Sequence, residues 1–264
     1  MKLRPVLYIQ RHKAQHHMKA MEAGFPGDRC NLDDNRLAKV RGGQPSLHII
    51  GGLQYGALAR LCEIRAGGEP YIFYDRAYFG GGPRSDRLRI EANAYQRHIL
   101  DWHVEPGRAR ALGVELADWR KDGSHILVVP PGPAIRSLFG LGDWEKETLA
   151  RLKRCTDRPV RVSYKDDPVP LAERLRNCWA VVTWTSNVAV DAICAGIPAF
   201  VSRWSAAMPV AENLAQLESY IEGPRRHPGV ADREEWADSL AWGQFNLDEI
   251  ASGLARSIVM EKFA

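Results

Sequence analysis

Short apolar runs recur along the chain and alternate with longer segments of mixed polarity. Three runs in the first third of the chain predict strands, at Val6–Gln10, Leu47–Ile50 and Tyr71–Tyr74. Segments of helical composition lie between them, at His12–Ala23 and Tyr55–Arg65. Strands that alternate with helices are typical of a parallel sheet that helices cover on its faces.

A second and clearer alternation begins at His125. Its apolar runs predict four strands, at Ile126–Val129, Val160–Ser163, Ala180–Thr183 and Ala199–Ser202. Helical patterns separate them, at Glu145–Arg154, Leu171–Cys178 and Asn187–Ala195. The strands are rich in Val, Ile and Ala, as expected where both faces of a sheet are covered.

Polar and glycine-rich segments suggest how the chain is divided. Loops are predicted at Gly24–Gly43 and at Asp75–Arg89, and a boundary between two lobes near Lys121–Ser124. A C-terminal helix is expected to start at a capping residue near Asn246 and could cross back to the first lobe. The predicted parts are residues 1–122, 123–243 and 244–264.

The composition of the 264 residues is ordinary for a globular protein, with 45% hydrophobic and 26% charged residues. A formal net charge of +4 and a pI near 8.8 permit a polyanionic partner without requiring one. No apolar run approaches the ~20 residues of a membrane helix. The short apolar stretch before Arg11 is unlike a signal peptide. We therefore expect a cytoplasmic protein without a membrane partner.

Cysteines and histidines give little sign of a metal site. Five cysteines are present, an odd number without CxxC spacing, which favours free thiols over disulfides or a zinc cluster. His12 and His16 could share a helical face, but no carboxylate or cysteine lies near them in the sequence. We expect neither a metal nor a cofactor.

The strongest candidate site follows the predicted strand that ends at Thr183. Thr185, Ser186 and Asn187 come next, and an apolar helix begins at once. Backbone N–H groups and the helix dipole at such a turn favour an anion such as a diphosphate, and the two hydroxyls add donors. Asp191 lies one turn further along the same helical face, where a carboxylate can accept hydrogen bonds from ribose hydroxyls. Helix capping by Ser186 or Asn187 is the simpler alternative, but it leaves Asp191 unexplained.

This stretch, followed by Gly196-Ile197-Pro198, resembles the donor-binding element of GT-B glycosyltransferases and sugar-nucleotide epimerases. The resemblance implies that Ser186 and Asn187 hold the diphosphate, with Thr185 beside them, and that Asp191 holds the ribose. It also implies an α/β fold of two Rossmann-like lobes with parallel sheets, the GT-B architecture. A compact N-terminal lobe would then bind the acceptor, and the C-terminal lobe would bind the nucleotide-sugar.

Two further segments extend the resemblance to both lobes. Tyr74–Gly80 and Ala237–Ile250 are similar to segments of phage-encoded and capsule-type glycosyltransferases. Some phage members of this set glycosylate hydroxymethylated bases in DNA. The resemblance therefore adds DNA to the possible acceptors, and the cytoplasm of a host cell to the possible locations.

Asp75 is the candidate catalytic residue. It ends a predicted strand, where open α/β sheets place ligands, and its carboxylate could take the proton of an acceptor hydroxyl. An ion pair with Arg76 or Arg89 that shapes the loop is the structural alternative. The arginines and the tyrosine of this region could bind the phosphates and an unstacked base of DNA, or could form a solvated loop. These acceptor-side candidates are Arg76, Tyr78, Arg84, Arg87 and Arg89.

Four other residues come after predicted strands, and the resemblance to GT-B enzymes implies that they lie on the donor side. Gly132 could line the pocket, and Arg136 just beyond it could meet phosphate. A rigid proline turn is the alternative for the segment that holds Gly132. Arg203 could reach the diphosphate, and Glu212 would lie near the donor sugar.

These residues lead to a first hypothesis. It is a monomeric glycosyltransferase that moves a sugar from a nucleotide-sugar, with UDP-glucose as the expected donor, to 5-hydroxymethylcytosine in DNA. A capsular or surface polysaccharide is the alternative acceptor. A non-catalytic module that binds nucleotides or nucleic acids, and a sugar-nucleotide epimerase, are the alternatives with a different activity.

Overall fold

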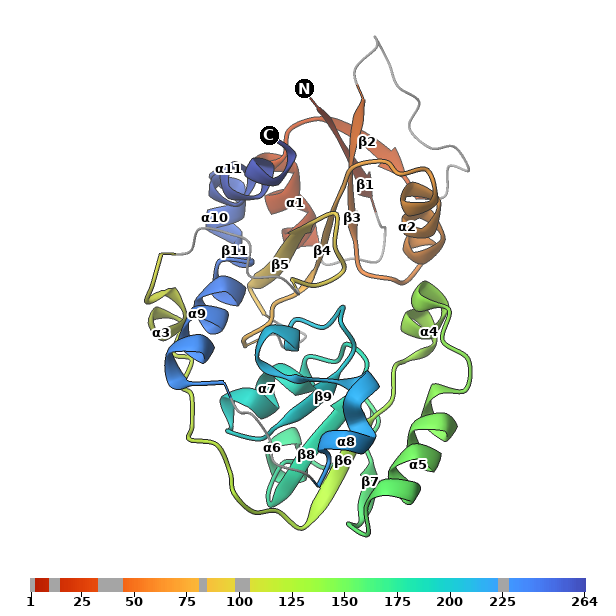
Figure 1. Ribbon diagram of the computed structural model, residues 1–264. Coiled ribbons are helices and arrows are strands. Elements are labelled where there is room, and N and C mark those ends of the chain that lie inside the picture. The colour runs from red at the N-terminus through yellow and green to blue at the C-terminus, as the bar shows by residue number, and fades with distance from the viewer. Residues whose placement is uncertain (1–2, 10–14, 33–44, 81–84, 98–104, 223–227) are drawn as a thin grey trace. The chain divides into compact units, whose positions relative to one another are not determined.

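The computed structural model describes residues 3–9, 15–32, 45–80, 85–97, 105–222 and 228–264 (Figure 1). The chain forms two compact units. Unit 1 contains residues 1–95 and 243–264, and unit 2 contains residues 96–242. Each unit has its own β-sheet and its own buried core.

A six-stranded sheet forms unit 1, in the order β11-β5-β4-β3-β1-β2. Its parallel strands are β1 (Arg4–Ile9), β2 (Asp28–Asn31), β3 (Ser46–Gly51) and β4 (Tyr71–Arg76). Strands β5 (Arg87–Ala92) and β11 (Gln244–Asn246) extend the sheet by antiparallel pairing of β5 with β4 and of β11 with β5. Strands β1, β3 and β4 confirm the three strands predicted from apolar runs, and most of their side chains are buried.

The other three strands of this sheet lie where the sequence predicts loop or helix. Strand β2 falls within the predicted loop at Gly24–Gly43, β5 begins in the predicted loop at Asp75–Arg89, and β11 lies in the predicted helical tail. These predictions are wrong because the three strands are short or charged and are held by pairing with a neighbouring strand. Arg4 of β1, for example, forms an ion pair with Asp28 of β2.

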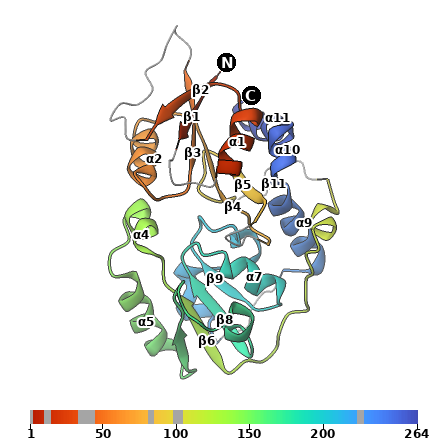
Figure 2. The same cartoon turned by 180° about the vertical axis from the view of Figure 1, so that it is seen from behind.

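Helices lie on both sides of this sheet. They are α1 (Gln15–Gly24), α2 (Ala57–Ala66), α10 (Leu247–Ala251), α11 (Leu254–Met260) and the 3-10 turn η3 (Glu261–Phe263). Helix α2 lies on one side, and α1, α10 and α11 lie on the other (Figures 1 and 2). Helices α1 and α10 approach so closely that a Cβ atom on Gly24 would lie 1.9 Å from the Ile250 carbonyl oxygen. The Asn246 side chain caps α10 by accepting a hydrogen bond from the Glu249 N–H, which confirms the predicted helix start.

Unit 2 contains a five-stranded, all-parallel sheet in the order β10-β9-β8-β6-β7. The strands are β6 (His125–Val129), β7 (Val160–Val162), β8 (Cys178–Thr183), β9 (Ala199–Val201) and β10 (Glu212–Asn213). The first four confirm the strands predicted for this half of the chain. Strands β6, β8 and β9 are almost fully buried, in agreement with their apolar composition.

The helices of unit 2 lie before, between and after these strands. They are α3 (Arg108–Ala111), α4 (Pro133–Phe139), α5 (Trp144–Cys155), α6 (Leu171–Arg174), α7 (Val188–Cys194), α8 (Leu217–Tyr220), α9 (Val230–Ala241) and the 3-10 turns η1 (Met208–Val210) and η2 (Leu214–Gln216). Helices α5 and α7 confirm the predictions at Glu145–Arg154 and Asn187–Ala195. The helix predicted at Leu171–Cys178 is only the single turn α6, because Cys178 already belongs to β8.

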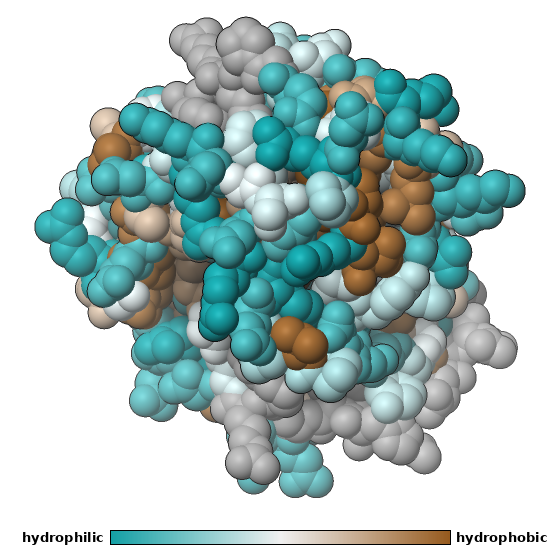
Figure 3. Space-filling view, turned by 90° about the horizontal axis from the view of Figure 1, so that it is seen from below, coloured by the Kyte–Doolittle hydropathy of each residue, from teal (hydrophilic) through white to brown (hydrophobic). Residues whose placement is uncertain are grey.

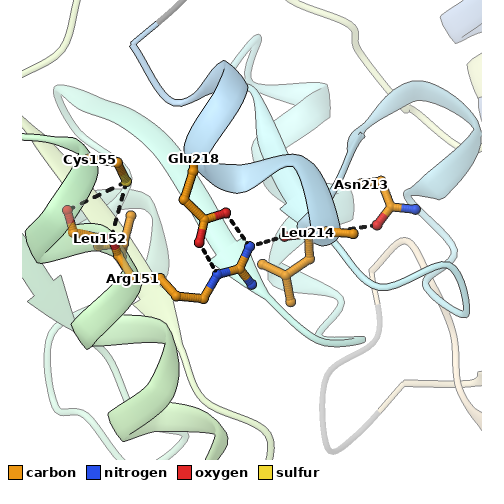
Figure 4. A network of polar contacts seen from close by, with 7 residues as sticks. Arg151, Leu152, Cys155, Asn213, Leu214 and Glu218 are labelled. Carbon is orange, nitrogen blue, oxygen red and sulfur yellow. Dashed lines mark hydrogen bonds and ion pairs between the residues drawn. The ribbon is translucent and has the colours of Figure 1, made fainter.

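A polar network joins the outer helices α5 and α8 of unit 2 (Figure 4). Two nitrogens of Arg151 donate to the two carboxylate oxygens of Glu218, each at 2.5 Å, and one also donates to the Leu214 carbonyl at 2.9 Å. The hydrogen bonds from Arg151 lower the pKa of Glu218 to about 2. Leu152 and Leu217 of the same two helices lie in the core beside the sheet.

The boundaries of the two units differ from the boundaries of the predicted lobes. Residues 96–122 lie in unit 2, although the sequence groups them with the first lobe, and residues 243–264 lie in unit 1. Hydrogen bonds hold the first segment to α9, since Asp238 accepts from the N–H groups of Gly107 and Ala109 at 2.8 and 2.7 Å. Such backbone contacts leave no periodic pattern in a sequence.

The order of the strands indicates where each unit can bind a ligand. Strand β6 is the first strand of unit 2 along the chain. Strand β7 is added on one side of it, and β8, β9 and β10 are added in turn on the other side. The order of addition therefore reverses between the neighbouring strands β6 and β8. In unit 1 the same change falls between β1 and β3. Open α/β sheets bind ligands outside the carboxyl ends of the strands at this topological switch point.

None of the described helices is long and apolar enough to cross a membrane. The face of the molecule in Figure 3 is mostly hydrophilic, and its hydrophobic side chains form a few separate groups. Among the described residues, the exposed large hydrophobic side chains lie on different elements, and they are Tyr55, Tyr164, Val169, Val230 and Leu254.

Candidate functional site

The loops after β6 and β8 lie next to each other at the switch point of unit 2. Residues 130–132 lead from β6 into α4, and residues 184–187 lead from β8 into α7. The strand ends are paired, because Val129 lies opposite Thr183. The Thr183 hydroxyl also donates to the Val129 carbonyl at 2.7 Å. A ligand bound at this point is therefore expected to contact both loops.

The turn at residues 184–187 contains the predicted diphosphate-binding residues. Ser186 Oγ accepts a hydrogen bond from the Val188 N–H at 3.3 Å, and its own hydroxyl proton can still be donated. The Ser186 backbone N–H has no protein acceptor among the residues that the structure describes. Thr185 is buried, with 5% of its surface exposed. Ser186 is thus the residue of this turn that is best placed to donate to an anion.

A buried glutamine that the sequence analysis missed holds this turn. Gln96 Nε2 donates to the Thr185 carbonyl at 2.9 Å and to Asn187 Oδ1 at 3.1 Å. Gln96 Oε1 accepts from the Ala206 N–H at 2.9 Å, in the loop after β9. The Asn187 oxygen is therefore engaged within the protein, and Asn187 makes no side-chain cap of α7. Gln96 is itself uncharged and lies in a segment without clean periodicity, so the sequence does not mark it.

Asp191 lies on α7, one helical turn beyond Asn187, whose carbonyl accepts a hydrogen bond from the Asp191 N–H at 3.1 Å. Desolvation by the surrounding protein raises the pKa of Asp191 to about 6. The residue is nevertheless exposed to solvent. Protein thus surrounds the carboxyl group without sealing it off, and a ligand hydroxyl can reach it from solution.

The loop after β6 leads into α4, which carries the cationic side chain of Arg136. Gly132 lies just before α4, in an extended conformation, and a Cβ atom there would have no described neighbour within 4 Å. Arg136 of α4 is exposed. The Phe139 ring at the end of α4 meets the Trp184 ring edge to face, with ring centres 6.1 Å apart. The two loops thus share an aromatic contact.

The two remaining donor-side candidates follow or belong to β9 and β10, which lie on the side of β8 that faces away from β6. Arg203 follows β9, is exposed, and places its guanidinium 4.6 Å from the centre of the Trp204 ring. Glu212 is partly exposed and belongs to the edge strand β10, where it pairs with Phe200 of β9. Strand β9 separates Glu212 from β8, so Arg203 lies nearer in the strand order to the turn at residues 184–187.

Asp75 lies near the carboxyl end of β4 in unit 1. It is paired across the strands with Arg89 of β5, and their side chains are 3.6 Å apart. This contact is the ion pair that the sequence analysis gives as the structural alternative. The Arg89 guanidinium is buried among the rings of Phe73, Tyr78 and Tyr95, at 5.8, 5.5 and 4.9 Å from their centres. The Asp75 side chain keeps 30% of its surface exposed and remains accessible to an acceptor.

The predicted acceptor-side residues do not form one exposed patch. Arg76 is exposed and Arg87 is partly exposed. Tyr78 and Arg89 are only 2% and 3% exposed, and the Tyr78 hydroxyl donates to Glu91 at 2.8 Å. Arg84 lies outside the described residues. Burial thus removes two of the five candidates from the surface that a nucleic acid could touch.

Metal ligands are not grouped in the part of the chain that the structure describes. There, no group of three or more His, Cys, Asp or Glu side chains could hold a metal ion. His17 contacts the Ser85 carbonyl at 3.1 Å, and His12 lies outside the described residues.

Two hollows open on unit 2 away from the switch-point loops. One, of about 700 Å³, lies between α3 and α9, and the other, of about 620 Å³, lies between the end of α5 and Pro159. No predicted donor-side residue is among the described residues that line either hollow. The candidate site is therefore defined by strand order and by the polar groups of its loops.

Comparisons with known proteins show a likeness in fold. No protein-family model and no curated protein matches the chain. Among solved structures, the chain is similar to the β-Kdo 2,4-transferase of KpsC from Thermosulfurimonas dismutans, with a TM-score of 0.52, 12% identity, and coverage of 97% of this chain and 99% of that one. The β-Kdo 2,7-transferase of the same KpsC gives a TM-score of 0.46 at 12% identity, over 96% and 98% of the two chains.

The likeness to the 2,4-transferase confirms the predicted fold class, an α/β chain of two Rossmann-like lobes with GT-B architecture. This neighbour is a capsule-type glycosyltransferase, so it agrees with that part of the resemblance drawn from the sequence. The likeness gives no support to the resemblance to phage enzymes that modify DNA. At 12% identity it concerns the fold alone.

Proposed function

We propose that the chain is a glycosyltransferase that moves a sugar from a nucleotide-sugar to a hydroxyl group of a capsular or surface polysaccharide. The observation that carries the proposal is the turn at residues 184–187, at the switch point of an all-parallel sheet, with Asp191 one helical turn beyond it. The likeness in fold to the β-Kdo 2,4-transferase supports the same class of reaction.

In this proposal the donor binds across the carboxyl ends of β6 and β8. Ser186 donates its hydroxyl and its backbone N–H to a phosphate, and Asp191 accepts hydrogen bonds from the ribose hydroxyls. Helix α7 has seven residues, so we assign most of the positive charge to the exposed guanidinium groups of Arg136 and Arg203. Cations and N–H donors at this position stabilise the negative charge that develops on the departing nucleotide.

Asp75 is the proposed general base. An acceptor hydroxyl oxygen attacks the anomeric carbon of the sugar while its proton passes to the Asp75 carboxylate. The bond between the anomeric carbon and the phosphate oxygen breaks, and its electron pair leaves with the nucleotide. The ion pair with Arg89 fixes the direction of the carboxylate, since Arg89 is itself held among three aromatic rings.

A polysaccharide acceptor is favoured over a base in DNA for two reasons. The structural neighbour is a Kdo transferase, whose substrate is a sugar. Two of the five residues expected to bind DNA, Tyr78 and Arg89, are buried. Because the structural neighbour transfers Kdo, nucleotide-activated Kdo is tested as a donor beside UDP-glucose.

The test is to incubate the chain with nucleotide-activated Kdo or with UDP-hexoses. Each donor is paired with a capsule-type oligosaccharide or with duplex DNA that contains 5-hydroxymethylcytosine. Nucleotide release and the mass of the acceptor are measured. We expect a gain of one sugar mass on the oligosaccharide. A gain on the DNA nucleoside instead would replace the proposed acceptor, and the absence of nucleotide release with every pair would contradict the proposal of a transferase.

A further inference from the structure

Gln96 occupies a central position among the loops of the candidate donor site. It is the first residue of unit 2 and has 2% of its surface exposed. Its side-chain amide contacts the turn after β8 through Thr185 and Asn187, and the loop after β9 through Ala206. Trp236 of α9 holds the same loop from its other side, because its indole N–H donates to the Ala206 carbonyl at 2.8 Å.

The hydrogen bond from Gln96 to the Thr185 carbonyl sets the direction of one peptide plane. In a trans peptide the C=O group of one residue and the N–H group of the next point to opposite sides. Since the Thr185 carbonyl points to Gln96, the Ser186 N–H must point away from it. That N–H has no acceptor in the described part of the protein, and Ser186 itself is partly exposed.

We infer that Gln96 is a positioning residue of the donor site, which turns the Ser186 N–H outward to donate to a phosphate of the nucleotide-sugar. This inference rests on the proposed function. Gln96 itself is buried and touches no ligand, so its effect on binding passes through the Thr185–Ser186 peptide. The hydrogen bond that the same amide donates to Asn187 Oδ1 keeps the side chain of Gln96 in the required orientation.

Gln96→Ala removes the three side-chain hydrogen bonds described above and frees the peptide to rotate. A hydrogen bond to a charged group contributes about 1.5–3 kcal/mol, so we expect UDP to bind about 10- to 100-fold more weakly. Uridine, which has no phosphate, should bind the variant as it binds the parent chain. Calorimetric titration of both proteins with UDP and with uridine measures this difference. A general loss of structure would weaken the binding of UDP and of uridine equally.

Gln244→Ala is the matched control. Gln244 is a buried glutamine of unit 1, with 1% of its surface exposed, and it also bonds a backbone segment, through the N–H and carbonyl of Phe79. The control should lose a comparable amount of thermal stability while it keeps the parent's affinity for UDP.

Gln96→Glu gives a second readout. The substitution keeps an acceptor for the Ala206 N–H but replaces the donor that faces the Thr185 carbonyl with a carboxylate oxygen. We expect weak UDP binding at pH 8 and partial recovery at pH 5, relative to the parent at each pH, because a protonated carboxyl group can donate again.

Equal UDP affinity in the Gln96→Ala and Gln244→Ala proteins would overturn the inference and leave the proposed function intact. An equal loss of affinity for UDP and for uridine in Gln96→Ala would also overturn the inference. If the parent chain did not bind UDP, the inference would be overturned, whereas the proposed function would stand or fall on the nucleotide-release assay. Selective loss of UDP binding in Gln96→Ala supports both.

Discussion

Asp191 is a carboxylate in a place that disfavours its charge. The protein around it raises its pKa to about 6, from the 3.8 of an ordinary aspartate. No ion pair with Asp191 is found in the described part of the chain to compensate for this. A desolvated carboxylate without a protein partner destabilises the fold. In the proposed function, the ribose hydroxyls of the donor supply the partner that the carboxylate lacks.

Asp191→Asn is therefore expected to stabilise the protein and to weaken donor binding. Below about pH 3.8 the carboxyl group is protonated in both folded and unfolded states, so the variant should gain nothing there. Between about pH 4 and 6 the unfolded state loses its proton first, so the parent chain loses stability relative to the variant. Above pH 6 the gain should stay constant. Thermal unfolding of both proteins from pH 4 to pH 8 measures it.

Asp166→Asn, at an exposed loop position, is the control for the loss of one negative charge. It should show no comparable pH-dependent gain. An Asp191→Asn protein that is less stable than the parent at pH 8 would show that the carboxylate has a structural partner.

Asp75→Asn tests the proposed base. General base catalysis typically contributes about 10²- to 10⁴-fold to a rate, and we expect kcat for sugar transfer to fall by that factor. The donor KM should remain close to that of the parent, because the proposed role of Asp75 is to accept the proton of the acceptor hydroxyl and not to bind the donor. Asp86→Asn, at an exposed position of unit 1, is the control. A rate that Asp75→Asn leaves unchanged would reduce the Asp75–Arg89 pair to a structural role.

At the scale of elements, the ion pair of Arg151 with Glu218 joins the helices α5 and α8. The pKa of Glu218 falls from 4.5 to about 2 because Arg151 donates hydrogen bonds to both carboxylate oxygens. The stability that this pair provides is fully present above pH 4.5 and is lost as the pH falls toward 2. Glu218 is 41% exposed, so solvent screens the pair and its contribution is modest.

Glu218→Gln should lower the free energy of unfolding by less than about 1 kcal/mol at pH 7. The difference from the parent should shrink as the pH falls below 4.5. Urea unfolding at pH 7 and pH 3 measures it. Glu173→Gln removes a weaker ion pair, with Arg176 at 3.9 Å, and should have the smaller effect. Equal effects of the two substitutions would argue against the bidentate pair as a special contact.

Gly24→Ala tests the contact between α1 and α10. The new Cβ atom would overlap the Ile250 carbonyl, and overpacking of this kind costs about 3 kcal/mol. We expect a clear fall in Tm, measured by circular dichroism. Gly142→Ala is the control, because a Cβ atom at Gly142 meets no described atom within 4 Å and its backbone is not left-handed. A neutral Gly24→Ala protein would show that α10 can move away from α1.

The buried strands were predictable because burial on both faces leaves a continuous apolar run, as in β6 and β8. Strands β2 and β5 were not, because pairing with a neighbouring strand holds charged residues such as Asp28 and Arg89 in the sheet. The turn at residues 184–187 was predictable from its residue types and its place after β8. Gln96 was not, because its role comes from contacts between residues about 90 to 110 positions apart.

At the scale of the whole molecule, unit 2 is continuous in sequence and unit 1 is not. A fragment of residues 96–242 contains a complete parallel sheet with its covering helices. We expect this fragment to unfold cooperatively and to bind UDP with an affinity similar to that of the full chain. Circular dichroism melting and calorimetric titration measure the two properties.

A fragment of residues 1–95 is the natural counterpart. It lacks strand β11 and the helices that pack on α1, so we expect no cooperative transition from it. Cooperative folding of residues 1–95 alone would show that the C-terminal segment is dispensable for unit 1.

The return of residues 243–264 to unit 1 also affects the synthesis of the chain. Ribosomes add about 5–20 residues/s, so the last strand of unit 1 emerges roughly 7 to 30 s after its first 95 residues. During that interval β5 has an unpaired edge, and the face of α1 that will hold α10 is open to water. We therefore expect the nascent residues 1–95 to bind chaperones until residues 243–264 emerge.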